Sequence, residues 1–519
     1  MEQNTMQLPR FLVGAPASNS GKTTVTCALL QAFKRRGLKL LACKSGPDYI
    51  DPAFHTRVIG AKSRNIDLFF TGKERARHLL ARNGLGIDLA ILEGAMGFYD
   101  GISVGSDNSA WDIARTTESP VVLVVDGRGR ARSISAEVLG FTRLHKDSNI
   151  RGLIINRCSP MLCERLAPVI EEDTGVPVLG CMPVLKDCLF ESRHLGLVGA
   201  DELDDLMAKL NRLADAAEEN IDLDALCSLA ATAPDLPLPA AGAASSVSAE
   251  AATTTAPAVP IAAELRTAEA AAPVTCSAST PYAMPAEAAV SAAPVTPELR
   301  PTEGSPLVAI AYDCAFNFYY EDAFDALRDA GLELALFSPC TDTALPAGAS
   351  GLYLGGGYPE LHARELSENT AMLTAIRHAI ASGMPTIAEC GGFLYLHEQL
   401  EDGEGVEWPL VGTIKGRAWA TPRLNRFGYV GLTAHNNSLL AEADDVLPAH
   451  EFHYWESDNC GSSFTAQKPQ SSRHWECVHT SPSLYAGFPH LALQGQPKAV
   501  ARFAQACAAF DKAQKEPLC

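Results

Sequence analysis

A Gly-Lys-Thr sequence set between an apolar run and a helical pattern constrains the fold of this chain more than any other feature. The segment from Gly14 to Thr26 reads Gly-Ala-Pro-Ala-Ser-Asn-Ser-Gly-Lys-Thr-Thr-Val-Thr and follows the apolar run Phe11–Val13. The apolar residues after it have the spacing of one helical face, and Gly37 provides a helix end. Backbone N–H groups of such a loop and the positive end of the helix attract an anion. The pattern therefore predicts a phosphate-binding loop rather than a purely structural turn.

The side chains of this loop have predicted roles in nucleotide binding. Lys22 is expected to reach the outer phosphates, and the Thr23 hydroxyl is expected to hold a magnesium ion. The spacing is longer than in the standard loop, because Gly14 stands seven residues before Gly21. The predicted ATP contacts in the loop are Asn19, Ser20, Gly21, Lys22, Thr23 and Thr24.

Charge and cysteine content argue against several kinds of protein. The 519-residue chain carries a formal net charge of −19, so its surface would repel nucleic acid. No Cys-x-x-Cys pair occurs among the 15 cysteines, which argues against a zinc ribbon. The N-terminus lacks the apolar core of a signal peptide, and no apolar run is long enough to span a membrane. We therefore expect a cytoplasmic protein with neither a nucleic-acid nor a membrane partner.

Two alternating patterns of apolar runs and helical stretches predict two doubly wound α/β domains. The expected strands of the first are almost wholly apolar, as in parallel sheets covered on both faces: Phe11–Val13, Leu38–Cys43, Leu89–Leu92, Pro120–Val125, Gly152–Ile155 and Val176–Gly180. The second pattern has expected strands at Leu307–Tyr312, Leu332–Phe337, Gly351–Leu354 and Thr386–Ala388, with helices at Asp322–Ala330 and Thr370–Ser382. An Ala/Pro/Thr-rich segment without periodicity separates them and predicts a disordered linker. The predicted divisions are residues 1–229, 230–304 and 305–519.

Polar residues follow the expected strands of the first domain, where parallel sheets bind their ligands. Asp48 comes soon after the second strand, and Glu93 follows the third. A carboxylate at such a position near a phosphate loop is a natural partner for Mg²⁺. We therefore assign Thr23, Asp48 and Glu93 to a magnesium site; the alternative is that the two carboxylates only cap loops.

A second chemical centre is predicted at Cys390. A strand is expected to end at Glu389 and a helix to start near Gly392, so Cys390 would stand on a sharp, exposed turn. The start of the helix is expected to favour its thiolate. A nearby glycine-rich loop would help to stabilise an oxyanion. The expected oxyanion donors are the backbone N–H groups of Gly356, Gly357 and Gly391.

A cysteine nucleophile also needs a base. His490 lies about 100 residues downstream, after strand-like sequence. The sequence His-Glu-Phe-His-Tyr supplies two further candidates, His450 and His453. Spacing alone leaves the choice among the three histidines open.

Several long motifs resemble those of the cobyrinate a,c-diamide synthases of corrinoid biosynthesis. The resemblance covers both domains and omits the linker. It implies an N-terminal domain similar to dethiobiotin synthetase and a C-terminal class I glutaminase domain. The motifs are Ser45–Pro52, Arg193–Leu197, Ala315–Tyr320, Gly355–Leu361, Ala388–Gly392 and His450–Tyr454.

The resemblance also assigns the base. The family has a histidine in a Tyr-x-His-x-His-Phe context, and His490 matches the first histidine of that motif. Ala492 stands at the second histidine, where related glutaminases carry the third member of a Cys-His-Glu triad. The implied catalytic pair is therefore a dyad of Cys390 and His490. Ala449 also replaces a glycine that is usual in the family.

The family implies ATP- and glutamine-dependent amidation of the a and c side-chain carboxylates of cobyrinate, through an acyl phosphate and ammonia from L-glutamine, in cobalamin biosynthesis. The implied ligands are ATP with Mg²⁺, L-glutamine and a corrinoid polycarboxylate, and a homodimer is an expected assembly. Asn156 is assigned to the adenine edge by analogy with dethiobiotin-forming relatives. Residues assigned to the macrocycle are Lys44, Tyr49, Asp51, Arg193 and His194; the last two are alternatively only a support for a surface loop.

Four other functions compete with this interpretation. Hydrogenobyrinate enzymes share the same motifs, so the sequence leaves open whether the macrocycle carries cobalt. Cobyric acid synthase has the same domain order, and nickel-sirohydrochlorin diamide synthase has very similar motifs. A ParA-like partition ATPase would carry a second lysine where this chain has Ala17, and it would leave the glutaminase pattern unexplained.

Overall fold

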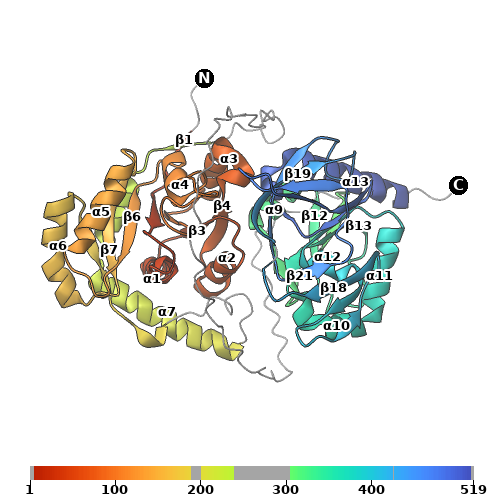
Figure 1. Ribbon diagram of the computed structural model, residues 1–519, viewed down its shortest axis with the longest axis horizontal. Coiled ribbons are helices and arrows are strands. Elements are labelled where there is room, and N and C mark those ends of the chain that lie inside the picture. The colour runs from red at the N-terminus through yellow and green to blue at the C-terminus, as the bar shows by residue number, and fades with distance from the viewer. Residues whose placement is uncertain (1–4, 189–199, 239–303, 425, 516–519) are drawn as a thin grey trace, which may run out of the picture.

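The computed structural model describes residues 5–188, 200–238, 304–424 and 426–515. They form two lobes that lie side by side in Figure 1. Residues 5–188 and 200–238 form the first lobe, and residues 304–424 and 426–515 form the second. The predicted contacts Arg193 and His194, and residues 239–303 of the predicted linker, lie outside the described residues.

A seven-stranded parallel sheet forms the centre of the first lobe, in the order β4-β3-β5-β2-β6-β7-β8. Its middle strand, β2, ends at Gly14, the first residue of the phosphate-loop sequence. The strands are β2 Arg10–Gly14, β3 Leu40–Ser45, β4 Lys62–Ile66, β5 Leu89–Glu93, β6 Val121–Asp126, β7 Ile150–Asn156 and β8 Val178–Met182.

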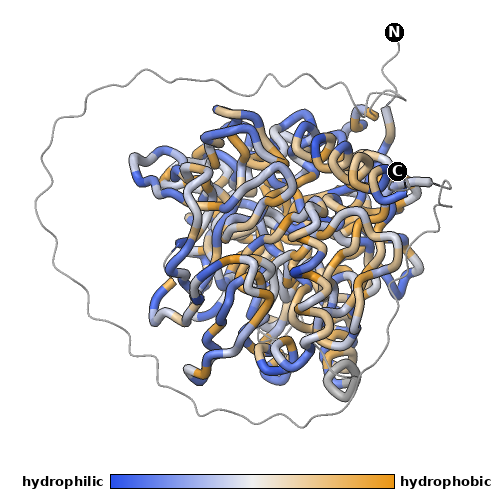
Figure 2. The backbone as a smooth tube through the Cα atoms, turned by 90° about the vertical axis from the view of Figure 1, so that its right-hand side faces the viewer, coloured by the Kyte–Doolittle hydropathy of each residue, from blue (hydrophilic) through white to orange (hydrophobic). Residues whose placement is uncertain are grey.

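Helices cover both faces of this sheet, because successive residues of each strand point to opposite sides. Phe11 and Val13 belong to one apolar core with α1, α7 and α8, whereas Leu12 belongs to another with α3 to α6. Figure 2 shows orange, apolar segments running through the interior. The helices are α1 Lys22–Arg35, α2 Ile50–Phe54, η1 His55–Ile59, α3 Leu68–Asn83, α4 Ala110–Thr116, α5 Ser133–Leu144, α6 Pro160–Thr174, η2 Lys186–Cys188, α7 Ala200–Asn220 and α8 Leu223–Ala231.

The second lobe has a six-stranded central sheet in the order β12-β10-β13-β15-β25-β24, parallel except at the β24–β25 edge. Its strands are β10 Leu307–Ala311, β12 Glu333–Phe337, β13 Ala349–Leu354, β15 Thr386–Glu389, β24 His479–Ser481 and β25 Leu484–Gly487. Its helices are α9 Glu321–Asp329, η4 Pro359–His362, α10 Ala363–Glu368, α11 Thr370–Ala381, α12 Gly391–Tyr395, η5 Leu493–Gly495 and α13 Pro497–Lys515. The two sheets confirm the predicted fold class.

Further small sheets were not foreseen from the sequence. The order β23-β22-β19-β20-β26 forms a five-stranded sheet, and β17-β16-β18-β21 forms a four-stranded one. Their strands are β16 His397–Glu401, β17 Glu407–Pro409, β18 Ile414–Ala420, β19 Arg426–Ala434, β20 Val446–His453, β21 Trp455–Ser457, β22 Phe464–Gln467, β23 His474–Cys477 and β26 His490–Leu491. Two pairs complete the set, β1 Thr5–Met6 with β9 Leu236–Pro237 and β11 Phe316–Phe318 with β14 Gly356–Gly357.

The first lobe continues beyond the boundary predicted at residue 229. Leu236 pairs with Met6 and is fully buried in an apolar core of that lobe. The predicted boundary lies too early in the chain because the Ala/Pro-rich composition begins before this strand. The strand itself forms because it pairs with the distant β1 and because burial of Leu236 stabilises that pairing. Among the described helices, none is both long and apolar enough to cross a membrane.

Polar and aromatic contacts join the two lobes. The Asn83 amide donates to Asp322 over 2.8 Å, and Arg64 forms an ion pair with the same carboxylate at 3.2 Å. The Tyr429 hydroxyl donates to Asp67 over 2.7 Å. Asp322 is almost fully buried, so these bonds satisfy a charge that would otherwise be desolvated without a partner.

Candidate active sites

The phosphate-loop sequence forms the turn between β2 and α1. Gly21 precedes the helix with φ +95°, a conformation that favours glycine. Lys22 is buried and donates to the carbonyl of Met96 and, over 3.4 Å, to that of Ala17. Burial lowers the pKa of Lys22 to about 8. Thr23 donates from Oγ1 to Glu93 Oε1 over 2.6 Å, so the loop and the end of β5 meet directly.

A buried charge cluster extends from Glu93 toward the second lobe. Lys44 Nζ lies 2.7 Å from Glu93 Oε1, 2.5 Å from Asp51 Oδ2 and 4.0 Å from Asp48 Oδ2. Burial lowers the pKa of Lys44, but the carboxylates of Glu93 and Asp51 outweigh it and raise that pKa above its usual value. The structure thus brings the residues predicted to bind magnesium, Thr23, Asp48 and Glu93, close to Lys44 and Asp51, which were predicted to contact the macrocycle.

One oxygen of Glu93 is available for a ligand. Among the described residues, its Oε2 has no hydrogen-bond partner although it is buried. The Thr23 hydroxyl and the carboxylates of Glu93 and Asp48 are hard oxygen donors, which is the donor type that Mg²⁺ prefers. The cluster therefore fits a magnesium ion.

Asn156 lies against the phosphate loop. Its Nδ2 donates to the Ser20 carbonyl over 2.8 Å, and a Cβ on Gly21 would approach this nitrogen to 2.0 Å. Sequence reasoning missed Arg157, which donates to the Asn19 carbonyl over 2.6 Å and pairs with Asp126 at 2.9 Å. In this structure Asn156 supports the loop backbone, and its assignment to adenine stays a prediction.

Cys390 occupies the sharp turn between β15 and α12. It has φ +48°, which is unusual for a non-glycine residue and typical of a strained nucleophile turn. Its N–H donates to the Gly487 carbonyl over 2.9 Å, and the next turn bond runs from Gly392 N–H to the Gly355 carbonyl over 2.8 Å. A Cβ on Gly391 would lie 2.9 Å from the Gly357 nitrogen, so the two glycine segments are in close contact.

His490 lies beside the same glycine loop. A Cβ on Gly356 would meet its Cε1 at 2.4 Å. Its Nδ1 is buried and has no hydrogen-bond partner among the described residues. Ala492, two residues later, offers no carboxylate. The histidine therefore lacks the orienting acid that a triad would provide.

The other two histidines have different surroundings. His453 Nδ1 contacts the Trp455 carbonyl at 2.6 Å, and its Nε2 contacts Glu451 at 3.2 Å. Its ring also stacks on Phe488 at 3.9 Å. His450 pairs across the antiparallel strands with His490, and burial lowers its pKa to about 3. His453 is thus held by three contacts, whereas His450 stands next to His490.

Burial sets the protonation of Cys390 and His490, the predicted catalytic pair. It raises the pKa of the Cys390 thiol above its usual range, with Glu360 adding to the effect, and lowers the pKa of His490 to about 3. The Gly391 N–H at the start of α12 does lower the pKa of Cys390, as expected, but desolvation outweighs this effect in the resting state. The pair rests as a neutral thiol and a neutral imidazole.

Sequence reasoning also missed Glu389. Its Oε1 accepts from Leu491 N–H over 2.8 Å, and its Oε2 accepts from the Tyr353 hydroxyl over 3.0 Å. It thereby links the residue before Cys390 to the residue after His490. Burial raises the pKa of Glu389 to about 8. Its position before the nucleophile, in an otherwise apolar strand, was the available signal.

Tyr49 brings the two sites into contact. It follows Asp48 in the first lobe, and its ring centroid lies 5.4 Å from that of His490. It also stacks on Phe318 at 5.2 Å and lies 4.6 Å from Tyr320. A residue predicted to touch the macrocycle is therefore packed among aromatic residues of the second lobe.

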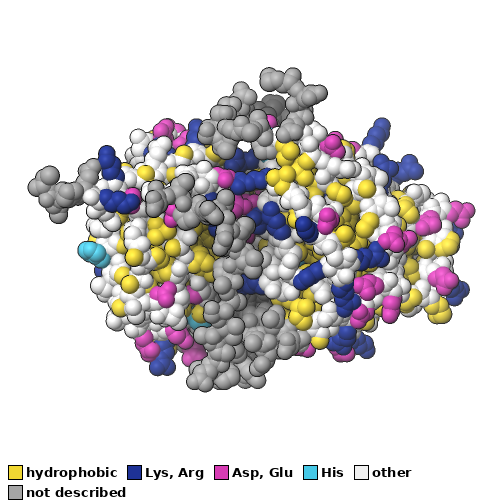
Figure 3. Space-filling model, turned by 180° about the vertical axis from the view of Figure 1, so that it is seen from behind, with side chains coloured by type: hydrophobic (Ala, Val, Ile, Leu, Met, Phe, Trp, Pro, Cys, Tyr) yellow, Lys and Arg dark blue, Asp and Glu magenta, His cyan; other side chains and the backbone are white. Residues whose placement is uncertain are grey.

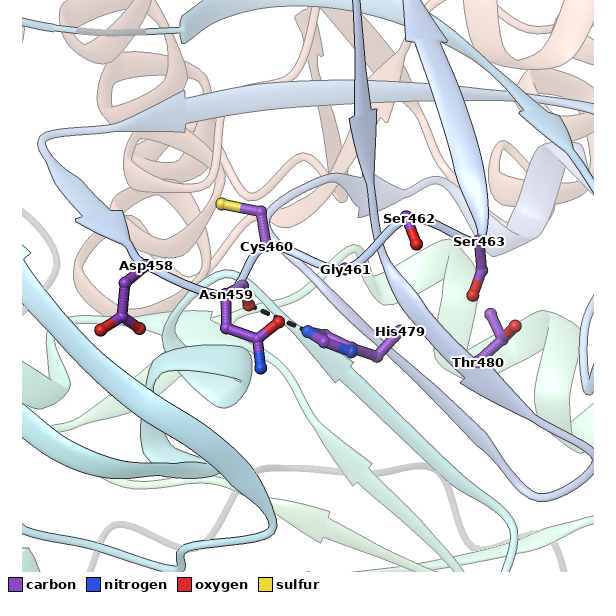
Figure 4. Close-up of a pocket in the computed structure, with 8 residues that line it drawn as sticks. All are labelled: Asp458, Asn459, Cys460, Gly461, Ser462, Ser463, His479 and Thr480. Atoms are coloured by element: carbon purple, nitrogen blue, oxygen red, sulfur yellow. Dashed lines mark hydrogen bonds between the residues drawn. The ribbon is translucent and has the colours of Figure 1, made fainter.

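A separate hollow on the second lobe contains none of the predicted site residues. It has a volume of about 380 Å³, and in Figure 4 His479 points across it toward Asn459, whose carbonyl it contacts at 2.9 Å. Its lining consists of Asp458, Asn459, Cys460, Gly461, Ser462, Ser463, His479 and Thr480.

Comparison with known proteins agrees with this geometry. Residues 11–195 match the CobQ/CobB/MinD/ParA nucleotide binding domain family, and residues 307–497 match the CobB/CobQ-like glutamine amidotransferase domain family. The cobyrinate a,c-diamide synthase of Caldanaerobacter subterraneus subsp. tengcongensis is 33% identical over 505 residues, covering 97% of this chain and 99% of that protein. The chain belongs to the cobyrinate a,c-diamide synthase family.

Two other relatives match over a similar share of the chain. The cobyrinate a,c-diamide synthase of Picrophilus torridus is 32% identical over 504 residues, covering 97% of this chain and 99% of its own. That of a Synechococcus strain is 33% identical over 500 residues, covering 96% and 98%. The resemblance on which the sequence analysis relied is confirmed: as in other cobyrinate a,c-diamide synthases, a nucleotide-binding domain precedes a glutamine amidotransferase domain.

Proposed function

We propose that this protein uses ATP and L-glutamine to convert the a and c side-chain carboxylates of cobyrinate to amides, giving cobyrinate a,c-diamide in cobalamin biosynthesis. The observation that carries the proposal is the contact of Tyr49 with His490, because it joins the phosphate-loop cluster to the cysteine site. Full-length similarity to the cobyrinate a,c-diamide synthases supports the choice of substrate. The free thiols of the described residues support a cytoplasmic location.

The first lobe activates the acid. A carboxylate oxygen attacks the γ-phosphorus of ATP, the bond to the β-phosphate oxygen breaks, and an acyl phosphate and ADP form. Lys22 would neutralise charge on the outer phosphates. Thr23, Glu93 and Asp48 would hold Mg²⁺, which would supply further neutralisation of phosphate charge. Ammonia then attacks the acyl carbon, and phosphate leaves.

The second lobe releases the ammonia from glutamine. His490 takes the proton of the Cys390 thiol as sulfur attacks the amide carbon, and it returns the proton to the departing ammonia. The N–H groups of Gly391, Gly356 and Gly357 would stabilise the oxyanion. Water then cleaves the thioester to glutamate. Burial lowers the pKa of His490 and so keeps its imidazole neutral near pH 7, but the same burial makes the ring a weaker base.

The macrocycle would bind on the exposed side of the charge cluster. Asp51 and Lys44 belong to this cluster, and we assign Arg193 and His194 to the same ligand by the family motif. In Figure 3, Lys and Arg side chains gather along the middle of the molecule despite the net charge of −19. Such cations would offset the carboxylates of a corrinoid acid. A homodimer remains a prediction of the family resemblance.

The test combines product mass with a separation of the two half-reactions. The chain is incubated with ATP, Mg²⁺ and glutamine, and with cobyrinate or hydrogenobyrinate in turn. We expect two successive mass changes on cobyrinate, each equal to replacement of OH by NH₂. Cys390→Ser should abolish the reaction with glutamine but keep it with ammonium chloride. Turnover of ATP without any amide would contradict the proposal.

A further inference from the structure

Two thiols and an imidazole form a cluster on the second lobe, outside both sites described above. Cys314 Sγ lies 4.0 Å from Cys340 Sγ and 3.7 Å from His362 Nδ1. Cys314 is exposed and Cys340 is partly buried, so small molecules in solution can reach the first sulfur. The reaction proposed above uses none of the three side chains.

The fold holds the two cysteines together. Cys314 comes soon after β10 and Cys340 soon after β12, and these strands are parallel neighbours whose ends leave the sheet at one edge. The carboxylate of Asp313 fixes both loops. Its Oδ1 accepts from Ala315 N–H over 2.8 Å, and its Oδ2 accepts from Cys340 N–H over 3.0 Å. The short sulfur separation is therefore built into the turn geometry.

The surroundings activate one thiol and leave the other protonated. Hydrogen bonding from Cys340, together with the His362 imidazole, lowers the pKa of Cys314 to about 5. The same contact with Cys314 raises the pKa of Cys340 above its usual range. An exposed thiolate beside a second thiol is the arrangement of a nucleophilic and a resolving cysteine.

A metal ion fits the cluster less well. Oxygen and sulfur atoms of Asp313, Cys314 and Cys340 lie within 4.8 Å of one another, but this group does not extend to His362, and a structural zinc site needs four donors. Each Asp313 oxygen already accepts two hydrogen bonds, the remaining donors being Phe316 N–H at 3.1 Å and Ser338 Oγ at 2.9 Å. The geometry favours sulfur–sulfur chemistry.

We propose that Cys314 and Cys340 form a reversible disulfide with each other, by thiol–disulfide exchange with a low-molecular-weight disulfide such as oxidised glutathione. We further propose that this bond slows glutamine hydrolysis. The Cys314 thiolate attacks one glutathione sulfur, forming a mixed disulfide and releasing one glutathione thiolate. Cys340 loses its proton to solvent and attacks Cys314 Sγ, and the second glutathione leaves. Two protein thiols are oxidised and one glutathione disulfide is reduced to two thiols.

The consequence for the glutaminase follows from contacts of the intervening turn. Ala315 accepts from Tyr358 N–H over 2.9 Å, and Phe316 pairs with Gly357 between β11 and β14. A Cβ on Gly357 would lie only 2.0 Å from the Ala315 oxygen, so the two segments are closely packed at this point. A disulfide brings the sulfurs from 4.0 Å to about 2.05 Å, which displaces the turn and with it the glycine loop at Cys390. The effect on amidation rests on the proposed function; the bond itself does not.

The experiment equilibrates the full-length chain in buffers of increasing oxidised-to-reduced glutathione ratio. Free thiols are then alkylated, and digested peptides are analysed by mass spectrometry alongside rates of glutamate formation. We expect a linked Cys314–Cys340 peptide and a several-fold fall in glutamine hydrolysis with one shared midpoint, both reversed by reductant. Amidation driven by ammonium chloride should change little, because the first lobe does not contain the bond.

Matched variants separate this bond from general oxidation. Cys314→Ser and Cys340→Ser should each make glutamine hydrolysis insensitive to the glutathione ratio. Cys227→Ser, at a partly buried thiol of the first lobe, should respond like the parent chain. Absence of the linked peptide at every ratio, or its formation without slower hydrolysis, would overturn the proposal. So would stoichiometric zinc that is lost in Cys314→Ser. Glutamate formation is measured without macrocycle, so failure of the proposed amidation would be seen separately.

Discussion

The phenol ring of Tyr49 lies 5.4 Å from the imidazole of His490, although the two residues belong to different lobes. Tyr49 stands between Asp48 and Asp51 in sequence, and Asp51 pairs with Lys44, which reaches Glu93 and hence Thr23 of the phosphate loop. A continuous series of contacts thus runs from the phosphate loop to His490, the predicted base.

Replacing Tyr49 should separate glutamine hydrolysis from amidation. Tyr49→Ala removes the contacts with Phe318 and Tyr320, each worth about 1 kcal/mol, and opens the lobe interface to water. We expect the ratio of glutamate formed to amide formed to rise several-fold. Tyr49→Phe keeps the ring and should stay close to the parent ratio. The expected rise assumes that ammonia passes from the second lobe to the first across this interface, shielded from water. Equal ratios in the alanine variant and the parent would contradict that assumption.

Lys44 should be important for stability as well as for ligand binding. Lys44→Met leaves Glu93 and Asp51 buried without their cation, and breaking such a pair costs about 3–5 kcal/mol. We expect a clearly lower denaturant midpoint for the first lobe. Arg364→Ala is the control, because the Arg364–Glu368 pair is exposed to solvent and should contribute little to stability. Similar midpoints for the two variants would refute the prediction.

The phosphate loop should not tolerate a side chain at Gly21. Gly21 has φ +95°, and an added Cβ would approach Asn156 Nδ2 to 2.0 Å, breaking the bond from Asn156 to the Ser20 carbonyl. We expect Gly21→Ala to weaken ATP binding about tenfold or more, measured by calorimetry. Gly37→Ala has a similar φ of +83° but no atom within 4 Å of the added Cβ. It should cost stability without weakening ATP binding.

Glu389 should make the folded chain less stable as pH rises from about 4.5 to about 8. Its pKa is raised by burial from 4.5 to about 8, so the folded chain keeps a proton that the unfolded chain releases above pH 4.5. Stability from this group is therefore complete below about pH 4.5 and is lost as pH rises toward 8, by about 2–4 kcal/mol. Glu389→Gln keeps an acceptor oxygen for Leu491 N–H and turns an NH₂ donor toward the Tyr353 oxygen, and it has no titrating proton. Denaturant midpoints compared between pH 5 and 8 should fall more for the parent than for the variant.

Much of the architecture could be predicted from local pattern. The strand at Phe11–Val13, the Gly-Lys-Thr sequence and the helix after it form the expected unit, because their conformations depend on neighbours a few residues away. The apolar run ending at Glu389 and the glycines after Cys390 likewise predict a turn, and Cys390 has φ +48° there. The smaller sheets of the second lobe escaped prediction, because several of their strands have only two to four residues and because β20 also pairs with the more distant β26.

The amino-acid sequence by itself determined the two α/β sheets, the phosphate loop, the cysteine turn and membership of the family, since each depends on local order or on motifs. Only the tertiary structure decided that His490 lies beside Gly356, that Tyr49 packs against it, and that burial keeps the Cys390 thiol protonated. The physical reason is range: a short stretch encodes its own backbone conformation, whereas proximity and desolvation arise when segments hundreds of residues apart pack together.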